Sequence, residues 1–135
     1  MGIPNILVVD DERDMRIFVS TVAETLGFEA IAAQDGTEAL LKASSNPPAL
    51  VVLDVMMPKI DDGIQTYRQF RTDPSLSHIP IIMLSAIAEK TFLHSIKMLS
   101  PQQGPQLPEP EAYMEKPPDA NELSRLISDL LPVDS

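Results

Sequence analysis

The sequence predicts one α/β domain, in which five strands alternate with five helices around a parallel sheet covered on both faces. Two patterns predict this class: short aliphatic runs, and between them longer segments whose apolar residues recur at helical spacing. The length of 135 residues suits a single domain. Hydrophobic residues form 44% of the chain, which is normal for a globular core.

The predicted strands are short runs rich in valine, leucine and isoleucine, as buried parallel strands are. They are 5–9 (NILVV), 28–33 (FEAIAA), 49–54 (ALVVLD), 79–85 (IPIIMLS) and 112–115 (AYME). Pro80 stands near the beginning of its run, where its missing N–H does least harm.

A segment with helical spacing follows each predicted strand. The first runs from Asp11 to Leu26 and ends at Gly27. The last begins at Asp119, and Glu122 three residues later completes a capping-box pattern. The apolar faces of the three between them are Ala39, Leu40 and Ala43; Ile64, Tyr67 and Phe70; and Phe92, Leu93, Ile96 and Leu99.

The composition narrows the function classes. A formal net charge of −10 opposes direct binding to nucleic acid or to an anionic membrane. No apolar run approaches the roughly 20 residues of a membrane span, and the N-terminus lacks the basic segment of a secretory signal. Because cysteine is absent, disulfides and thiolate metal sites are excluded, which fits a cytoplasmic location.

Polar residues gather where the predicted strands end. Asp10 and Asp11 follow the first strand, Asp54 ends the third, Ser85 ends the fourth and Lys116 follows the fifth. Ligand sites of parallel α/β sheets lie beyond the carboxyl ends of the strands. We therefore expect these side chains to meet at one edge of the sheet.

Three carboxylates at one edge need a cation, because two of them about 4 Å apart repel by roughly 4 kcal/mol at an effective dielectric constant of about 20. An all-oxygen donor set suits Mg²⁺ (or Mn²⁺). A lysine and a hydroxyl suit an oxyanion. A carboxylate that faces a phosphoryl donor can act as its nucleophile and form an acyl phosphate.

Each of these residues also has a structural interpretation. Asp10 and Asp11 suit a strand end and a helix N-terminus. Serine ends many strands, as Ser85 does, and Tyr113 suits core packing as well as a functional role. The joint placement of Asp54 and Lys116 at matching strand ends favours a site.

Four segments, VVDDE, LVVLDVMMP, IIMLSA and YMEKP, resemble the receiver domain of two-component response regulators. They occur in the family's order, and the resemblance covers nearly the whole chain. It implies a flavodoxin-like (βα)5 fold, which is a doubly wound parallel sheet of strand order 2-1-3-4-5. The whole chain, residues 1–135, is then expected to form a single receiver domain.

The resemblance implies a role for each candidate residue. Asp54 is the phosphoacceptor. The divalent metal ion is bound by Asp10, partly through water, by Asp11 more directly, by Asp54 and by the backbone carbonyl of Met56. Ser85 and Lys116 contact the phosphoryl group.

Further residues are implied to control switching and kinetics. Tyr113 is the aromatic switch, and the Lys116–Pro117 peptide bond is expected to be cis. Met56 and Ile87 occupy the two positions that tune self-dephosphorylation. Neither side chain can orient a water molecule, so we expect slow loss of the phosphoryl group and no other enzymatic activity.

The implied partners are proteins. A sensor histidine kinase or phosphotransfer protein donates the phosphoryl group. The surface of the fourth helix, fifth strand and fifth helix meets an unknown output protein or a fused output domain. The receiver is a monomer or a phosphorylation-dependent dimer, and the end of the chain fits both a stand-alone receiver and one cut from a longer regulator.

Two departures from the family pattern leave an alternative open. One extra residue stands between Pro58 and Gly63, and a proline-rich insertion occupies about 100–111. A receiver-like interaction module that works without phosphorylation therefore stays in view. An aspartyl phosphatase is disfavoured because Met56 stands where its second acid belongs, and a flavin carrier because the acidic DDERDM replaces its phosphate loop.

Overall fold

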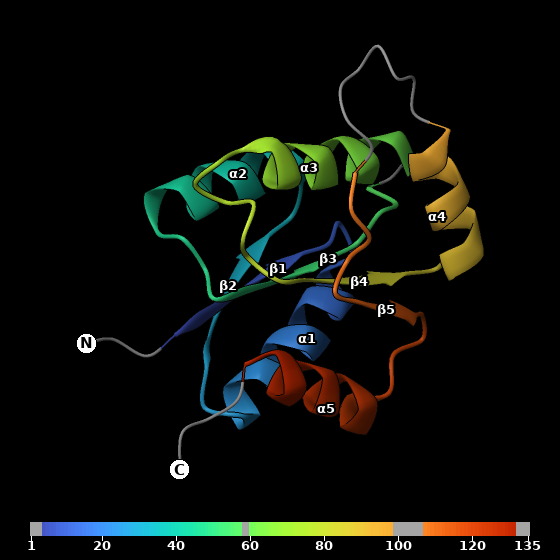
Figure 1. The fold of residues 1–135 in the computed structure, drawn as a ribbon. Coiled ribbons are helices and arrows are strands. Elements are labelled where there is room, and N and C mark those ends of the chain that lie inside the picture. Colours follow the sequence, from blue (N-terminus) through green and yellow to red (C-terminus); the bar gives the residue numbers. More distant parts are fainter. Residues whose placement is uncertain (1–3, 58–59, 99–106, 132–135) are drawn as a thin grey trace.

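A computed structural model describes residues 4–57, 60–98 and 107–131, and for residues 60 and 61 it describes the backbone alone. Its five parallel strands lie in the order β2-β1-β3-β4-β5, so the predicted flavodoxin-like order is confirmed (Figure 1). The strands are β1 Asn5–Val9, β2 Glu29–Ala33, β3 Leu50–Leu53, β4 Ile81–Ser85 and β5 Ala112–Glu115.

Helices cover both faces of the sheet, with α1 and α5 on one side and α2, α3 and α4 on the other (Figure 1). They are α1 Arg13–Thr25, α2 Gly36–Ser45, α3 Ile60–Thr72, α4 Glu89–Lys97 and α5 Ala120–Leu130. Gly27, with a φ of 93°, follows α1, and the Asp119 side chain accepts a hydrogen bond from the Glu122 N–H at the beginning of α5. Leu99, expected on the fourth helix, lies outside the described residues. Within the described ranges, no helix is both long enough and apolar enough to cross a membrane.

The central strands β1, β3 and β4 are buried along their whole length and almost entirely apolar, because each face of the sheet carries its own core. In β1, Leu7 and Val9 pack with side chains of α2, α3 and α4, whereas Ile6 and Val8 pack with α1 and α5. Two-sided burial explains why the sequence shows continuous hydrophobic runs instead of alternation. The polar side chains of the central strands therefore gather at and beyond the strand ends.

Backbone pairing brings the strand ends into register. Val9 lies opposite Leu53, and the Asp54 N–H donates to the Val9 carbonyl at 2.9 Å. Between the neighbouring strands β4 and β5, the Lys116 N–H donates to the Ser85 carbonyl at 2.8 Å. The residues expected in the site are thus held at one edge by hydrogen bonds that do not depend on their side chains.

The loop after β3 is held by helix α3. A Cβ atom placed on Gly63 would lie 2.0 Å from the Val55 carbonyl oxygen, so only glycine allows this approach of the two backbones. Helix α3 begins at Ile60, and Pro58 and Lys59, where the extra residue was expected to act, lie outside the described residues.

The proline-rich insertion ends in an anchored segment. Residues 100–106 lie outside the described part of the chain, but residues 107–111, which we name the strap, are described. Leu107 is buried in the core beside α2, α3 and α4. The buried Tyr67 hydroxyl of α3 donates a hydrogen bond of 2.6 Å to the Pro108 carbonyl. The sequence predicts only an extended loop here.

A buried arginine ties the strap to α3 and β4. The Arg71 side chain, 4% exposed, donates from Nη2 to Glu111 Oε1 at 2.6 Å and from Nη1 to the Ile79 carbonyl at 3.1 Å. Its Nε donates to the Tyr67 hydroxyl at 3.1 Å. Glu111 Oε1 also accepts the Ile81 N–H at 2.7 Å. The strap therefore sets where β5 begins, next to the beginning of β4.

Replacing Glu111 of the strap is expected to destabilise the fold. Glu111→Ala leaves the Ile81 N–H and part of the buried Arg71 guanidinium without an acceptor, and the free energy of unfolding should fall by about 1–3 kcal/mol. Urea denaturation measures the change. The exposed neighbour Glu109 provides the control, since Glu109→Ala should change stability by less than about 0.5 kcal/mol. Equal losses of unfolding free energy in the two variants would show that the Glu111 contacts with Arg71 and the Ile81 N–H do not stabilise the strap.

Candidate functional site

Four acidic side chains meet at the carboxyl edge of the sheet. Asp10, Asp11, Glu12 and Asp54 each offer a carboxylate oxygen, and these oxygens lie within 4.8 Å of one another. Asp10 and Asp54 are buried, whereas Asp11 and Glu12 are exposed. The structure thus brings together the three acids expected from the sequence. It adds Glu12, whose only signal in the sequence is that it continues the Asp-Asp pair.

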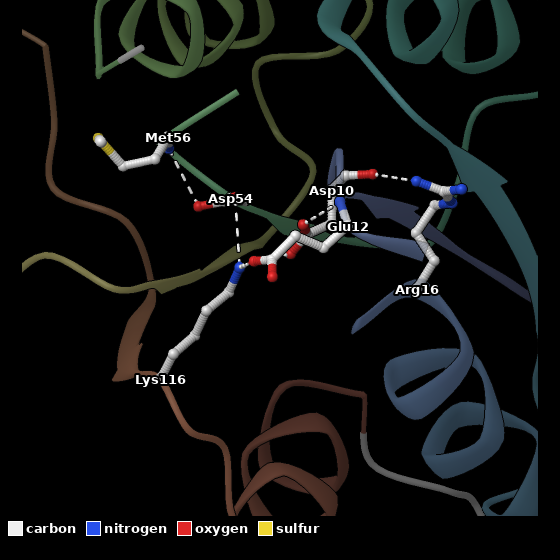
Figure 2. Close-up of polar contacts among 6 residues, drawn as sticks. All are labelled: Asp10, Glu12, Arg16, Asp54, Met56 and Lys116. Carbon is white, nitrogen blue, oxygen red and sulfur yellow. Dashed lines mark hydrogen bonds and ion pairs between the residues drawn. The ribbon is translucent and has the colours of Figure 1, made fainter. Parts of the chain in front are cut away.

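Lys116 reaches this cluster from the end of β5. Its ammonium nitrogen lies 3.0 Å from Asp10 Oδ2, 2.8 Å from Glu12 Oε1 and 3.3 Å from Asp54 Oδ2 (Figure 2). The lysine side chain is 10% exposed. One largely buried cation is therefore shared by three carboxylates on two strand ends.

Backbone N–H groups hold the other oxygens of the two buried acids. The Glu12 N–H donates to Asp10 Oδ1 at 2.9 Å, and the Met56 N–H donates to Asp54 Oδ1 at 3.0 Å. Arg16, which the sequence analysis did not single out, donates from Nη1 to the Asp10 carbonyl at 2.8 Å. Both buried carboxylates are thereby fixed in orientation before any ligand arrives.

The protonation equilibria reflect burial and pairing. Burial raises the pKa of Asp10 to about 6 and also raises the pKa of Asp54, while the backbone N–H groups and Lys116 oppose both shifts. Burial lowers the pKa of Lys116, but its carboxylate partners, first among them Glu12 and Asp10, raise it by more. The lysine is therefore a permanent cation, and the acids hold their negative charge against a desolvation cost.

Ser85 places a hydroxyl beside the acids. The residue is fully buried, and its Oγ forms no hydrogen bond within the described part of the chain. The hydroxyl lies close enough to Asp54 and Tyr113 to oppose the rise that burial causes in the pKa of each, although it meets hydrogen-bond geometry with neither. A buried hydroxyl without a partner is uncommon, and it suits a site that receives an additional oxygen acceptor.

The remaining expected residues surround this centre. The half-buried Tyr113 donates from its hydroxyl to the Ile87 carbonyl at 2.9 Å, and its ring centre lies 5.7 Å from that of Phe92. Burial raises the Tyr113 pKa to about 12, so the hydroxyl stays protonated. The Met56 side chain points away from Asp54 (Figure 2). The Lys116–Pro117 bond is cis, as expected.

Comparison with known families agrees with this geometry. A family model described as the response regulator receiver domain matches residues 6–100. The chain therefore belongs to the response regulator receiver family. The match stops at the insertion, whereas the fold continues through β5 and α5 on its far side.

Curated relatives are longer proteins. The chain is 37% identical over 126 residues to the alkaline phosphatase synthesis transcriptional regulatory protein PhoP of Bacillus subtilis, covering 93% of this chain and 48% of that protein. It is 48% identical over 84 residues to the probable transcriptional regulator ycf27 of Pyropia yezoensis, covering 62% of this chain and 33% of that protein. The chain thus spans about half or less of the length of these relatives.

Solved structures match nearly the entire chain. The chemotaxis protein CheY4 of Vibrio cholerae superposes with a TM-score of 0.79 at 25% identity, covering 96% of this chain and 100% of that one. The N-terminal domain of a response regulator receiver protein from Methanoculleus marisnigri is 30% identical, with a TM-score of 0.68 and coverage of 98% and 100%. These matches include the elements that follow the insertion.

Removing the shared cation is expected to destabilise the protein in a pH-dependent way. Lys116→Met leaves two buried carboxylates without their counter-ion, which should cost about 3–5 kcal/mol near neutral pH. The loss of the ammonium raises the folded-state pKa values of Asp10 and Asp54 further. A group whose pKa is raised on folding favours the folded state below its unfolded pKa, and this advantage disappears as the pH rises through its folded pKa.

The stability deficit of Lys116→Met should therefore be largest near pH 7. It should shrink near pH 5, below the Asp10 pKa of about 6 in the parent protein. Urea titrations at the two pH values measure it. Lys90→Met, at an exposed position of α4, removes the same charge and should show little deficit at either pH. A deficit that does not change with pH would contradict the assignment of Lys116 as counter-ion.

Proposed function

We propose that this chain is a phosphorylation switch whose phosphoacceptor is Asp54. The donor is a sensor histidine kinase or a phosphotransfer protein in the cytoplasm. One observation carries the proposal: the buried Asp54 carboxylate lies 3.3 Å from the Lys116 ammonium, and the nearby buried Ser85 hydroxyl has no partner within the described residues. This arrangement supplies a nucleophile, a cation and a free hydrogen-bond donor for an incoming phosphoryl group.

The transfer step uses the Asp54 carboxylate as nucleophile. A carboxylate oxygen attacks phosphorus, a new P–O bond forms, and the P–N bond to the donor histidine breaks. The electron pair leaves with the imidazole, which takes up a proton. The product is an acyl phosphate that carries nearly two negative charges, which Lys116 pairs with and to which the Ser85 hydroxyl donates.

The acids around Asp54 fit a hard divalent cation, Mg²⁺ or Mn²⁺. The donor set is entirely oxygen, and the four carboxylates outnumber the single ammonium, which three of them contact. Asp10, Asp11, Asp54 and the backbone carbonyl of Met56 are the proposed ligands. Bound there, the metal ion would neutralise charge on the phosphoryl oxygens during transfer.

Phosphorylation is proposed to act on the surface formed by α4, β5 and α5. In the form described here, the Tyr113 hydroxyl donates a hydrogen bond to the carbonyl of Ile87, and Ile87 lies two residues after Ser85. When Ser85 turns to the phosphoryl group, this segment shifts and Tyr113 changes its position, which alters the surface next to it. The output partner is a protein or a fused domain. The net charge of −10 disfavours direct contact with nucleic acid or membrane, and the resting form is proposed to be a monomer that can dimerise on phosphorylation.

Incubation with acetyl phosphate and Mg²⁺ should add one phosphoryl group to the parent protein, measured by intact mass. Asp54→Asn should abolish the gain because it removes the nucleophile, and chelation of the metal should prevent it. The exposed Asp14 supplies a control, since Asp14→Asn should be modified as readily as the parent. A parent protein that gains no mass would favour the interaction module that works without phosphorylation.

The acyl phosphate is expected to decay slowly because Met56 and Ile87 cannot orient an attacking water. Met56→Asn should speed the decay roughly tenfold, below the ~100-fold minimum typical of general-base catalysis, because an amide orients water without removing its proton. Decay is followed by intact mass after the donor is removed. Met56→Leu keeps an apolar side chain and should decay like the parent. An unchanged rate in Met56→Asn would contradict the idea.

A further inference from the structure

Carboxylates surround the Lys116 ammonium in the form described here, and it donates hydrogen bonds to Glu12 and Asp54. An ammonium group carries three donors, and three carboxylate oxygens lie within 3.3 Å of the lysine nitrogen, from Asp10, Glu12 and Asp54. A phosphoryl oxygen that approaches Lys116 must therefore compete with these carboxylates for the ammonium.

The three carboxylates differ in what holds them. The side chains of Asp10 and Asp54 are 4% and 1% exposed, and a backbone N–H binds the second oxygen of each. The Glu12 side chain is 63% exposed. Within the described ranges, its carboxylate has a single hydrogen bond, the one to Lys116. Water can replace that bond, so Glu12 is the carboxylate that is released at the lowest cost.

Glu12 also has no structural duty that requires its carboxylate. It is the N-cap residue of α1, yet its side chain makes no capping hydrogen bond. Its backbone N–H binds Asp10, and a substitution of the side chain keeps that bond. The contact with Lys116 is thus the feature that distinguishes this carboxylate from an ordinary exposed acid.

We propose that Glu12 is a placeholder anion: it occupies Lys116 in the resting form and yields it to the phosphoryl group on Asp54. This inference rests on the proposed function and deepens it. Glu12 is a positioning residue that acts through Lys116. It keeps the ammonium directed at Asp54 and competes with the phosphoryl group for the same donor (Figure 2).

Kinetics with acetyl phosphate test the competition. Glu12→Gln removes the competing charge and should speed phosphorylation about two- to fivefold, the range that corresponds to an exposed ion pair. Glu12→Asp keeps the negative charge but shortens the side chain, so it should also speed the reaction. If Glu12 merely repelled the anionic donor, Glu12→Asp would react like the parent, and the placeholder role would be wrong.

The same variants exclude a role as metal ligand. The Mg²⁺ concentration for half-maximal phosphorylation should stay unchanged in Glu12→Gln, because the carboxylate faces Lys116 in the resting form. A severalfold increase in that concentration, or slower phosphorylation at saturating Mg²⁺, would overturn the proposal. Asp14→Asn, an exposed acid in the first turn of the same helix, is the charge-matched control and should behave like the parent.

A spectroscopic readout follows Glu12 directly. On addition of beryllofluoride and Mg²⁺, a phosphoryl mimic, the carboxyl carbon resonance of Glu12 should move to the position of a solvent-exposed glutamate, and in Asp54→Asn it should not move. If Asp54 responds to the mimic while Glu12 does not, the placeholder role fails and the phosphoacceptor survives. If neither responds and acetyl phosphate adds no mass, the proposed function itself fails.

Discussion

The contact between Lys116 and the buried acids of two other strands is the interaction on which this molecule depends. Parallel pairing forces Asp10 and Asp54 side by side, because Val9 lies opposite Leu53 in adjacent strands. Burial opposes both charges, and their proximity adds repulsion. The side chain of Lys116, which follows β5, is long enough to extend past the end of β4 and form ion pairs with both acids. The site is therefore a cluster of linked charges with an excess of negative charge, in which an incoming anion would compete for Lys116.

Separate ion pairs hold the two ends of β5. At its beginning, the strap is held by Arg71 and by the Glu111 contact with the Ile81 N–H. At its end, Lys116 binds the acids of β1 and β3. An edge strand is normally the least constrained part of a sheet. Here side chains from α3 and from the site hold it at both ends, which gives Tyr113 in its middle a defined resting position.

Much of the fold and of the site could be predicted from local patterns. Aliphatic runs placed the strands to within one or two residues, and the rule that strand ends share an edge brought Asp10, Asp54 and Lys116 together before any coordinates. The strand order came from the family resemblance, because periodicity carries no information about neighbours. Glu12 was not predicted as a partner of Lys116, since spacing places it at a helix N-terminus and says nothing about its rotamer. The Arg71–Glu111 pair joins residues forty positions apart with no periodic signal.

The anchored strap also bears on how the chain can diverge. Ile96 is buried before the insertion and Leu107 is buried within its anchored end, so the chain reaches β5 from a fixed point. Lengthening a loop between fixed ends is cheap, about 0.6 kcal/mol for each doubling of its length. Changes of sequence before Leu107 are therefore compatible with an unchanged sheet and an unchanged acidic cluster at its carboxyl edge.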